Sequence, residues 1–328
     1  MQRRPFLCAS MALALGAALG TATPASAQDN WPSKTIRIVV PFAAGGTSDA
    51  LARLLAERLQ VALKQTVIVE NKAGAGGVIG ADVVAKSPPD GYTLLLGTIA
   101  SNAINPALQP KIPYDAAKDF VPVFFIGNIA NVVLVGANQP YKSIKDLIAA
   151  AKAKPGTLAY GTPGAGSSQH LSGVKFSLDA GVELVHVPYK GSGPSLQDVM
   201  AGQIPMSFET ALTALPQINA GKVRALAVTT GKRAKVLPDV PTLAESGLKG
   251  FDVASWQALF APAGTPPAIV NRLNAELTKI VGETQVAARL YAMGVENVPM
   301  TPAQFADFQR AELAKWSKIV KDGHVKPE

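Results

Sequence analysis

The chain has 328 residues, of which 48% are apolar and 16% are charged, so it is a globular chain long enough for more than one core. Its formal net charge of +8 comes from scattered lysines and arginines. Without basic runs interleaved with aromatic residues, a nucleic-acid partner is not expected. The single cysteine, Cys8, lies near the N-terminus, so the rest of the chain has no disulfide and no cysteine nucleophile or metal ligand.

Residues 1–27 are predicted to be a signal peptide. Arg3 and Arg4 precede a short apolar stretch that ends in Ala25-Ser26-Ala27, a small-residue cleavage site. The two arginines leave the twin-arginine export route open beside the general one. A membrane anchor is disfavoured because the apolar run is short and broken by glycines. We expect cleavage after Ala27 and export to the periplasm, and no later segment is apolar enough to cross a bilayer.

After the leader, short apolar runs alternate with amphipathic segments almost to the end of the chain. The expected strands are 35–41, 66–70, 92–96, 132–135, 158–160, 183–187, 205–208 and 223–229. The expected helices are 51–59, 80–86, 143–153, 168–179, 195–201, 214–220, 267–281 and 302–321. This alternation predicts parallel sheets with helices on both faces.

Eight or more strands without a single repeat indicate two sheets, and therefore two lobes. We expect residues 28–127 and 225–328 to form lobe 1 and residues 128–224 to form lobe 2. The fold class is then α/β, with two doubly wound α/β lobes joined by a two-strand hinge. Ligands favour the cleft between lobes of this kind.

Three strand-to-helix turns are rich in glycine and hydroxyl residues: 42–49, 160–168 and 187–195. Such turns let successive amides point at an anion, and the helix dipole adds partial positive charge. None carries the lysine of a phosphate loop, so a carboxylate fits better. Each turn alone is also compatible with a connection that binds nothing. Two turns on opposite lobes could close on a two-ended acid.

Motifs for nucleotide cofactors, metals and catalysis are missing. The segment GAGGVIG at 74–80 has one residue too many between its glycines for a dinucleotide fingerprint. There is no G-x-S-x-G elbow and no spaced metal-ligand cluster. His170 is interpreted as a ligand contact or a packed helix residue, and His186 as a core residue. No cofactor and no metal are expected.

Four further residues each have two possible roles, one at the ligand and one in the structure. Asp49 either braces the first turn and caps its helix or contacts a donor group of the ligand. Glu209 either binds an amine or hydroxyl of the ligand or belongs to the N-cap region of a helix. Ser101 either lines the cleft or does not, and Trp256 is either an aromatic wall or a core residue between the lobes.

Several stretches resemble the substrate-binding receptors of tripartite tricarboxylate transporters, the Bug or TctC family of extracytoplasmic solute receptors. They are WPSKTIRIVVPFAAGGTSDALAR, VIVENKAGAGGVIGADVVAKSPPDGYTLLLG, YGTPGAGSSQHLSG, VPYKGSGPSLQDVMAGQI and GKVRALAVTTGKRAKVLPDVPTLAESG. The resemblance covers the mature chain. It implies a periplasmic binding protein-like, type II-like fold that closes over a carboxylate, held largely by backbone amides and ordered water.

Carried over to this sequence, the resemblance implies a ligand site built from strand-end loops. The implied residues are Phe42, Ala43, Ala44, Gly46, Thr47, Ser48, Asp49, Ser101, Gly161, Thr162, Gly164, Gly166, Ser167, Ser168, His170, Tyr189, Lys190 and Glu209. The family usually has Asp or Asn where this chain has Glu209, which leaves the size of the ligand open.

We therefore expect a monomeric, non-enzymatic periplasmic receptor. It would bind a small organic carboxylate and deliver it through transient contact with membrane transporter subunits. The candidate ligands are di- and tricarboxylates, aromatic acids and acidic amino acids. Two alternatives remain: a sensor that signals to a membrane histidine kinase or regulator, and an exported hydrolase.

Overall fold

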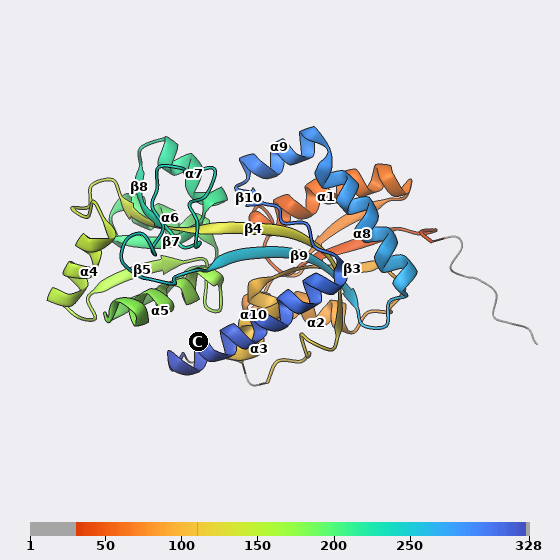
Figure 1. The fold of residues 1–328 in the computed structure, drawn as a ribbon, viewed down its shortest axis with the longest axis horizontal. Helices are drawn as coiled ribbons and strands as arrows, with labels where there is room; N and C mark the ends of the chain where they lie inside the picture. Colours follow the sequence, from red (N-terminus) through yellow and green to blue (C-terminus); the bar gives the residue numbers. More distant parts are fainter. Residues whose placement is uncertain (1–30, 110, 326–328) are drawn as a thin grey trace, which may run out of the picture.

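The computed structural model describes residues 31–109 and 111–325 (Figure 1). The predicted signal peptide lies outside these residues. The strands follow one path, β2-β1-β3-β9-β4-β7-β5-β6, and β8 and β10 add to β4. Figure 1 shows this path divided into two lobes that β4 and β9 connect through the middle of the molecule. The α/β fold with two doubly wound lobes and a two-strand hinge is therefore confirmed.

Each lobe contains a parallel set of strands. In lobe 1, β1 (Ile36–Val40) lies between β2 (Val67–Asn71) and β3 (Thr93–Thr98). In lobe 2, β5 (Leu158–Thr162) lies between β6 (Leu184–Pro188) and β7 (Met206–Thr210). Because these strands are parallel, their carboxyl ends and the turns that follow lie at one edge of each sheet.

The hinge strand β4 (Phe120–Gly136) belongs to both lobes. Residues 120–130 pair with β9 (Ala254–Pro262), and residues 131–135 pair with β7. The sequence reading found only 132–135 of β4 and missed β9. Both strands run antiparallel to the strands beside them, so the expectation of purely parallel sheets was wrong at the hinge. The reason is that the chain has to cross between the lobes in both directions.

The second crossing lies further along the chain than residue 225. All of β8 (Val223–Val228) pairs with the lobe 2 half of β4. Both ends of residues 229–253 are held at that half, where the Thr229 amide donates to the Asn131 carbonyl and the Val253 amide donates to the Thr229 carbonyl, both at 2.9 Å. The middle of the segment also contacts lobe 1, because Lys235 is hydrogen-bonded to Glu296 and Tyr291. We propose the lobe boundaries after residue 130 and before residue 254, in place of 127 and 225.

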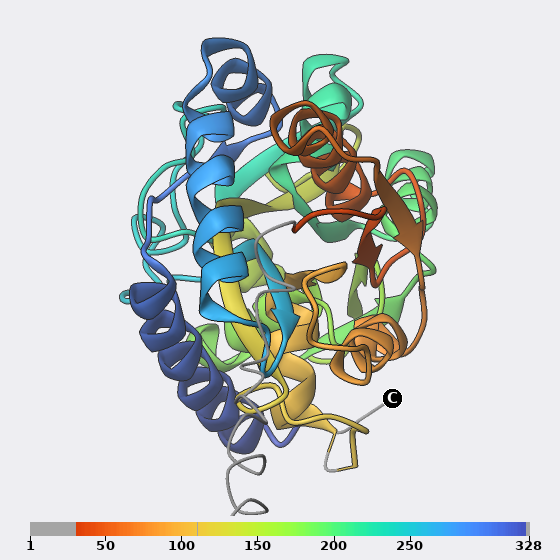
Figure 2. The same cartoon turned by 90° about the vertical axis from the view of Figure 1, so that its right-hand side faces the viewer.

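Helices cover both faces of the sheet in lobe 1. On one face, α1 (Thr47–Leu63) and α8 (Pro267–Gly282) share a core with α9 (Thr284–Ala292). The other face carries α2 (Val78–Ala85) and α10 (Pro302–Asp322). Figure 2 shows α8 and α10 on opposite sides of the sheet. The short β10 (Val295–Glu296) pairs with β4 between α9 and α10.

Lobe 2 is built in the same way. Its sheet is covered by α4 (Ile144–Ala153) and α5 (Ser168–Ala180) on one face, and by α6 (Ser192–Ala201) and α7 (Ala211–Asn219) on the other. In lobe 1, the turn after β3 forms η2 (Ala100–Ile104) and α3 (Asn105–Leu108), and η1 (Ala75–Gly77) precedes α2.

Trp256 belongs to the core and not to a wall of the site. It is 1% exposed, and its ring packs near Phe125 and Phe305. Its indole N–H donates to Glu312 Oε2 at 3.0 Å, and the indole of Trp316 donates to the same oxygen at 3.0 Å. A buried carboxylate that accepts from two indoles fixes α10 against the hinge strand β9.

Candidate functional site

The first turn, between β1 and α1, is braced by Asp49. Its Oδ2 accepts from the Gly45 amide and from Arg53 Nε, both at 3.0 Å. Burial alone would raise the pKa of Asp49, but the hydrogen bonds from Arg53, Gly45 and Asn71 hold it below its usual value. The first-turn amides of α1, beginning at Thr47, have no acceptor within the helix. They leave the end of α1 suited to an anion, with Asp49 already engaged.

The second turn, between β5 and α5, uses its own side chains to hold its shape. Ser167 Oγ caps α5 by accepting from the His170 amide at 3.1 Å, and it donates to the Gly164 carbonyl at 2.6 Å. The Gly166 amide donates to His170 Nδ1 at 3.2 Å, so that nitrogen carries no proton. His170 therefore shapes the turn.

His170 also stacks on His186 of β6. The ring centroids are 3.9 Å apart and the rings are inclined by 7°. His186 Nε2 lies 2.7 Å from Thr162 Oγ1, which in turn accepts from the Gly164 amide. Both histidines thus hold the second turn in place, and His186 lies beside the predicted site although sequence reasoning assigned it to the core.

The turns of the two lobes touch each other. Thr47 Oγ1 of α1 lies 3.3 Å from Thr210 Oγ1 at the end of β7. Asn105 Nδ2 donates to the Gly76 carbonyl within lobe 1. Gly166 of lobe 2 comes so close that a Cβ on it would lie 2.5 Å from Asn105 Oδ1. The lobes are therefore closed on each other at the predicted ligand turns.

The hinge strands contribute two polar residues that sequence reasoning missed. Ser48 Oγ donates to Gln257 Oε1 of β9 at 2.9 Å. Asn131 Nδ2 of β4 donates to Ser168 Oγ at 3.4 Å and to Ser172 Oγ at 3.2 Å. Each hinge strand thus holds the first turn of one helix, α1 or α5. The available signal was an isolated amide side chain inside an apolar strand.

Ser101 is tied into the turn that follows β3. Its Oγ accepts from the Thr98 amide at 3.0 Å and donates to Asn102 Oδ1 at 2.6 Å. Its carbonyl accepts from Tyr114 Oη at 2.6 Å. Ser101 is fully buried, so the geometry gives it a role in supporting the turn.

In the third turn, after β6, Tyr189 is held by a hydrogen bond and Lys190 is exposed. The Tyr189 hydroxyl donates to Asp198 Oδ2 at 2.6 Å, and burial together with this carboxylate raises the pKa of Tyr189 to about 12. The side chain thus stays neutral and fixes the turn to α6. Lys190 is exposed, and the structure does not bring it into the group of contacts between the lobes.

Glu209 is fully buried at the end of β7. Thr213 Oγ1 donates to Glu209 Oε2 at 3.4 Å and lies 3.1 Å from Thr210 Oγ1. Burial raises the pKa of Glu209 to about 8, although the hydroxyls of Ser192, Ser195 and Thr213 partly oppose this rise. Glu209 is thus linked through two threonines to Thr47 of the opposite lobe.

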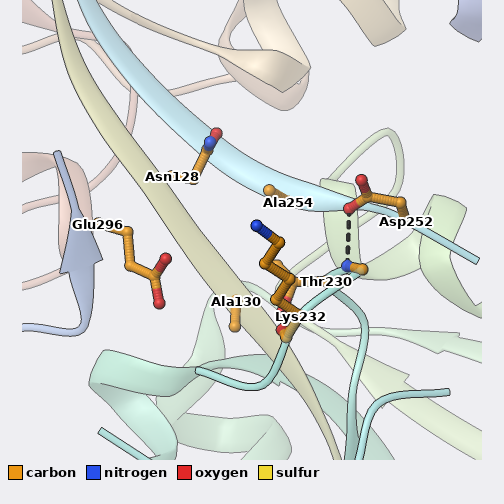
Figure 3. A pocket seen from close by; sticks show the side chains of 8 residues that line it. Asn128, Ala130, Thr230, Lys232, Asp252, Ala254 and Glu296 are labelled. Atoms are coloured by element: carbon orange, nitrogen blue, oxygen red, sulfur yellow. Dashed lines mark hydrogen bonds between the residues drawn. The ribbon is translucent and has the colours of Figure 1, made fainter. Parts of the chain in front are cut away.

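A cavity of about 320 Å³ lies at the hinge, away from these turns (Figure 3). Its lining residues are Asn128, Ala130, Thr230, Gly231, Lys232, Asp252, Ala254 and Glu296. Figure 3 shows the Lys232 amine directed between the two carboxylates. None of these residues was predicted for the site. Two carboxylates disfavour an organic acid here, so the candidate site remains at the strand-end turns.

Two features were looked for in the part of the chain that the structure describes: a group of metal ligands and a membrane-spanning helix. Within residues 31–109 and 111–325, no three His, Cys, Asp or Glu side chains are grouped so that they could hold a metal ion. In the same ranges, none of the helices combines the length and apolarity needed to span a bilayer.

Two lobes on crossing hinge strands, with helix N-termini meeting between them, define a two-lobed solute-binding protein. The family model "Tripartite tricarboxylate transporter family receptor" matches residues 51–324, and the chain belongs to this family. The resemblance seen in the sequence is thereby confirmed.

Similar proteins, two of them with solved structures, agree with this assignment. BugT of Bordetella pertussis is 39% identical over 311 residues, which cover 94% of this chain and 95% of that protein. The R. palustris protein Rpa4515, solved with adipate, is 39% identical with a TM-score of 0.86, and the match covers 91% of this chain and 100% of that one. MatC from Rhodopseudomonas palustris, solved with malate, is 34% identical with a TM-score of 0.82 over 88% and 100% of the two chains.

Proposed function

We propose that this protein is a periplasmic receptor that binds a small organic carboxylate between its lobes and delivers it to a tripartite membrane transporter. The observation that carries the proposal is the contact of Thr47 with Thr210, because it brings the N-terminal ends of α1 and α7 together between the lobes. Helix N-termini favour anions. That Rpa4515 and MatC were solved with adipate and malate supports the same ligand class.

In this proposal, one carboxylate of the ligand binds the amides at the start of α1. Asp49 does not oppose it strongly, since its charge is paired with Arg53. A second polar end meets lobe 2, where the turn at 164–168 and the end of β7 face lobe 1. The proposed contacts include residues 42–49, Thr162, the glycines of the second turn, Tyr189 and Glu209.

The remaining features of the proposed receptor follow from the same site. The protein works as a monomer without a cofactor and does not transform its ligand. Residues 1–27 direct export and are removed after Ala27. Membrane transporter subunits contact the closed form only transiently, because release of the ligand requires the lobes to open again.

The proposal is tested by thermal unfolding of the mature chain after it has been unfolded and refolded to strip any bound ligand. Adipate, malate, succinate and benzoate serve as probes, with glucose and glycerol phosphate as controls. At 100 times its dissociation constant, a ligand adds about 2.7 kcal/mol of stability. Shifts with carboxylates alone would support the receptor, and shifts only with the sugar or the phosphate ester would contradict it.

The first turn is tested by Gly46→Leu. A Cβ on Gly46 meets only the Ala43 carbonyl at 3.7 Å, so the fold should tolerate the side chain while the ligand's carboxylate does not. Gly282→Leu is the control, because a Cβ there meets nothing within 4 Å and the position lies at the end of α8. Unchanged affinity of Gly46→Leu for the best probe would remove the first turn from the site.

A further inference from the structure

A group of buried polar atoms lies on the face of lobe 2 that α6 covers. Gly161 of β5 is paired in register with Ser207 of β7, and a Cβ on Gly161 would lie 2.7 Å from Ser195 Oγ of α6. Glu209 is two residues beyond Ser207, so its side chain points to the same face of the sheet. Ser195, Ser207 and Glu209 therefore form one cluster.

Three atoms of this cluster make no well-formed hydrogen bond within the described residues: Ser195 Oγ, Ser207 Oγ and Glu209 Oε1. The Ser192 and Ser195 hydroxyls nevertheless lie near enough to the Glu209 carboxyl to oppose the rise in its pKa. All three side chains are 0% exposed. A buried polar atom without a hydrogen bond destabilises the fold, so three of them in one cluster point to a polar group that completes it.

The cluster is adjacent to the boundary between the lobes. Glu209 Oε2 accepts from Thr213, whose hydroxyl lies 3.1 Å from that of Thr210, and Thr210 lies 3.3 Å from Thr47 of lobe 1. Each step of this chain is a hydroxyl contact. Glu209 is thus connected through Thr213 and Thr210 to Thr47 at the start of α1.

In the part of the chain that the structure describes, the surroundings of Glu209 supply no positive charge to balance it. Among the described residues it forms no ion pair with lysine or arginine, and the titratable side chains on the elements around it are already engaged. Tyr189 and Asp198 bind each other at 2.6 Å, and Asp49 and Arg53 of lobe 1 form a pair at 3.0 Å. Burial without a paired cation favours the neutral form of the carboxyl, although the hydroxyls of Ser192, Ser195 and Thr213 partly oppose this.

We propose that Glu209 acts as an uncharged carboxylic acid that donates a hydrogen bond to the second polar end of the ligand. That end is then a carboxylate or another acceptor and not an ammonium group. The inference rests on the proposed function and narrows it, because it selects acids without an amine over acidic amino acids. Burial, which raises the pKa of Glu209 to about 8, supports the same protonation state at neutral pH.

The test compares two pairs of ligands that differ by one amine: glutarate with glutamate, and adipate with 2-aminoadipate. Their affinities for the wild type, Glu209→Gln and Glu209→Leu are measured by titration calorimetry at pH 6.5 and pH 9. Glutamine keeps a hydrogen-bond donor of the same shape, whereas leucine removes it. Circular dichroism and thermal unfolding establish that each variant is folded.

We expect the amine-free acids to bind the wild type at least tenfold more tightly than their amino counterparts. Glu209→Gln should keep this affinity within about threefold and bind equally at both pH values, while the wild type weakens at pH 9. Loss of one hydrogen bond to a charged group in Glu209→Leu should cost about tenfold or more.

Three results would overturn the inference. These are tighter binding of glutamate or 2-aminoadipate than of the amine-free acids, a tenfold loss in Glu209→Gln at pH 6.5, and unchanged affinity in a folded Glu209→Leu. If no carboxylate binds the wild type in the thermal unfolding screen, the proposed function fails and not this inference alone.

Discussion

The hydroxyl of Thr47 in lobe 1 lies 3.3 Å from the hydroxyl of Thr210 in lobe 2. These residues are 163 positions apart in the chain and stand at the first turns of two helices, α1 and α7. The contact joins the lobes on the side of the molecule where the strands end. The contact is therefore a marker of the closed form of the proposed ligand site.

Thr210→Val should weaken ligand binding without weakening the fold. The substitution keeps the shape of the side chain and removes the contact with Thr47 in the closed form, worth about 0.5–1.5 kcal/mol, or roughly two- to tenfold in affinity. It also removes the contact with Thr213 inside lobe 2, whose effect on the fold is measured by thermal unfolding. Calorimetry with the best carboxylate probe measures the change. Thr278→Val is the control, since that hydroxyl binds only the Asn274 carbonyl in α8. Equal affinities of the two variants would show that the contact between Thr47 and Thr210 does not contribute to ligand binding.

Gly166→Ala should hold the lobes apart. At φ +71° the added Cβ would lie 2.5 Å from Asn105 Oδ1 of the other lobe, so the closed form cannot persist unchanged. Gly181→Ala has a similar φ of +59° and no atom within 4 Å, and it controls for backbone strain of about 1 kcal/mol. Small-angle scattering with the best carboxylate probe should show a larger radius of gyration for Gly166→Ala alone.

The stability of the protein should depend on Glu209 between pH 4.5 and pH 8. Burial raises the pKa of Glu209 from 4.5 to about 8 in the folded state, so the folded protein holds a proton that the unfolded chain has released. The free energy of unfolding then falls as pH rises through this range, by up to about 1.4 kcal/mol per pH unit.

Urea unfolding of the wild type and Glu209→Gln at pH 5, 6.5, 8 and 9 checks this dependence. Glutamine does not titrate, so the variant should gain stability relative to the wild type as pH rises and keep that gain above pH 8. A constant difference between the two proteins over the series would mean that Glu209 is already ionised at pH 5.

Glu312→Leu should destabilise lobe 1. It removes the acceptor shared by the indoles of Trp256 and Trp316 and leaves two buried N–H groups unpaired, at about 1–3 kcal/mol each. Glu312→Gln retains an acceptor oxygen and should lose less than half as much. Urea unfolding followed by tryptophan fluorescence gives both values. A milder effect of leucine than of glutamine would show that the indoles find other partners.

The parts of the fold predicted best from sequence are those where local pattern decides the structure. The helix and strand positions around β1, α1, β5 and α5 followed from apolar periodicity and glycine turns. The hinge strands did not, because β4 is buried on both faces and is longer than an ordinary strand. Its apolar run therefore has no alternation to reveal it.

The candidate site shows the same division. The turns at 42–49 and 161–170 could be found from their glycines and hydroxyls. Gln257 and Asn131 were marked in the sequence only as isolated amides in apolar runs, and their role could not be predicted, since only the pairing of β9 and β4 brings them to Ser48 and Ser168. The burial of Glu209 could not be predicted from the sequence either, because it depends on how α6 and α7 pack over β7.

The two hinge strands are hydrogen-bonded neighbours where they cross, with Ala130 opposite Ala254. Both connections between the lobes therefore cross at one place, where β4 and β9 lie side by side. We therefore expect the lobes to open by rotation about that line. The gap should open widest at the free rim, where Asn105 faces Gly166, and a ligand would enter and leave by that rim.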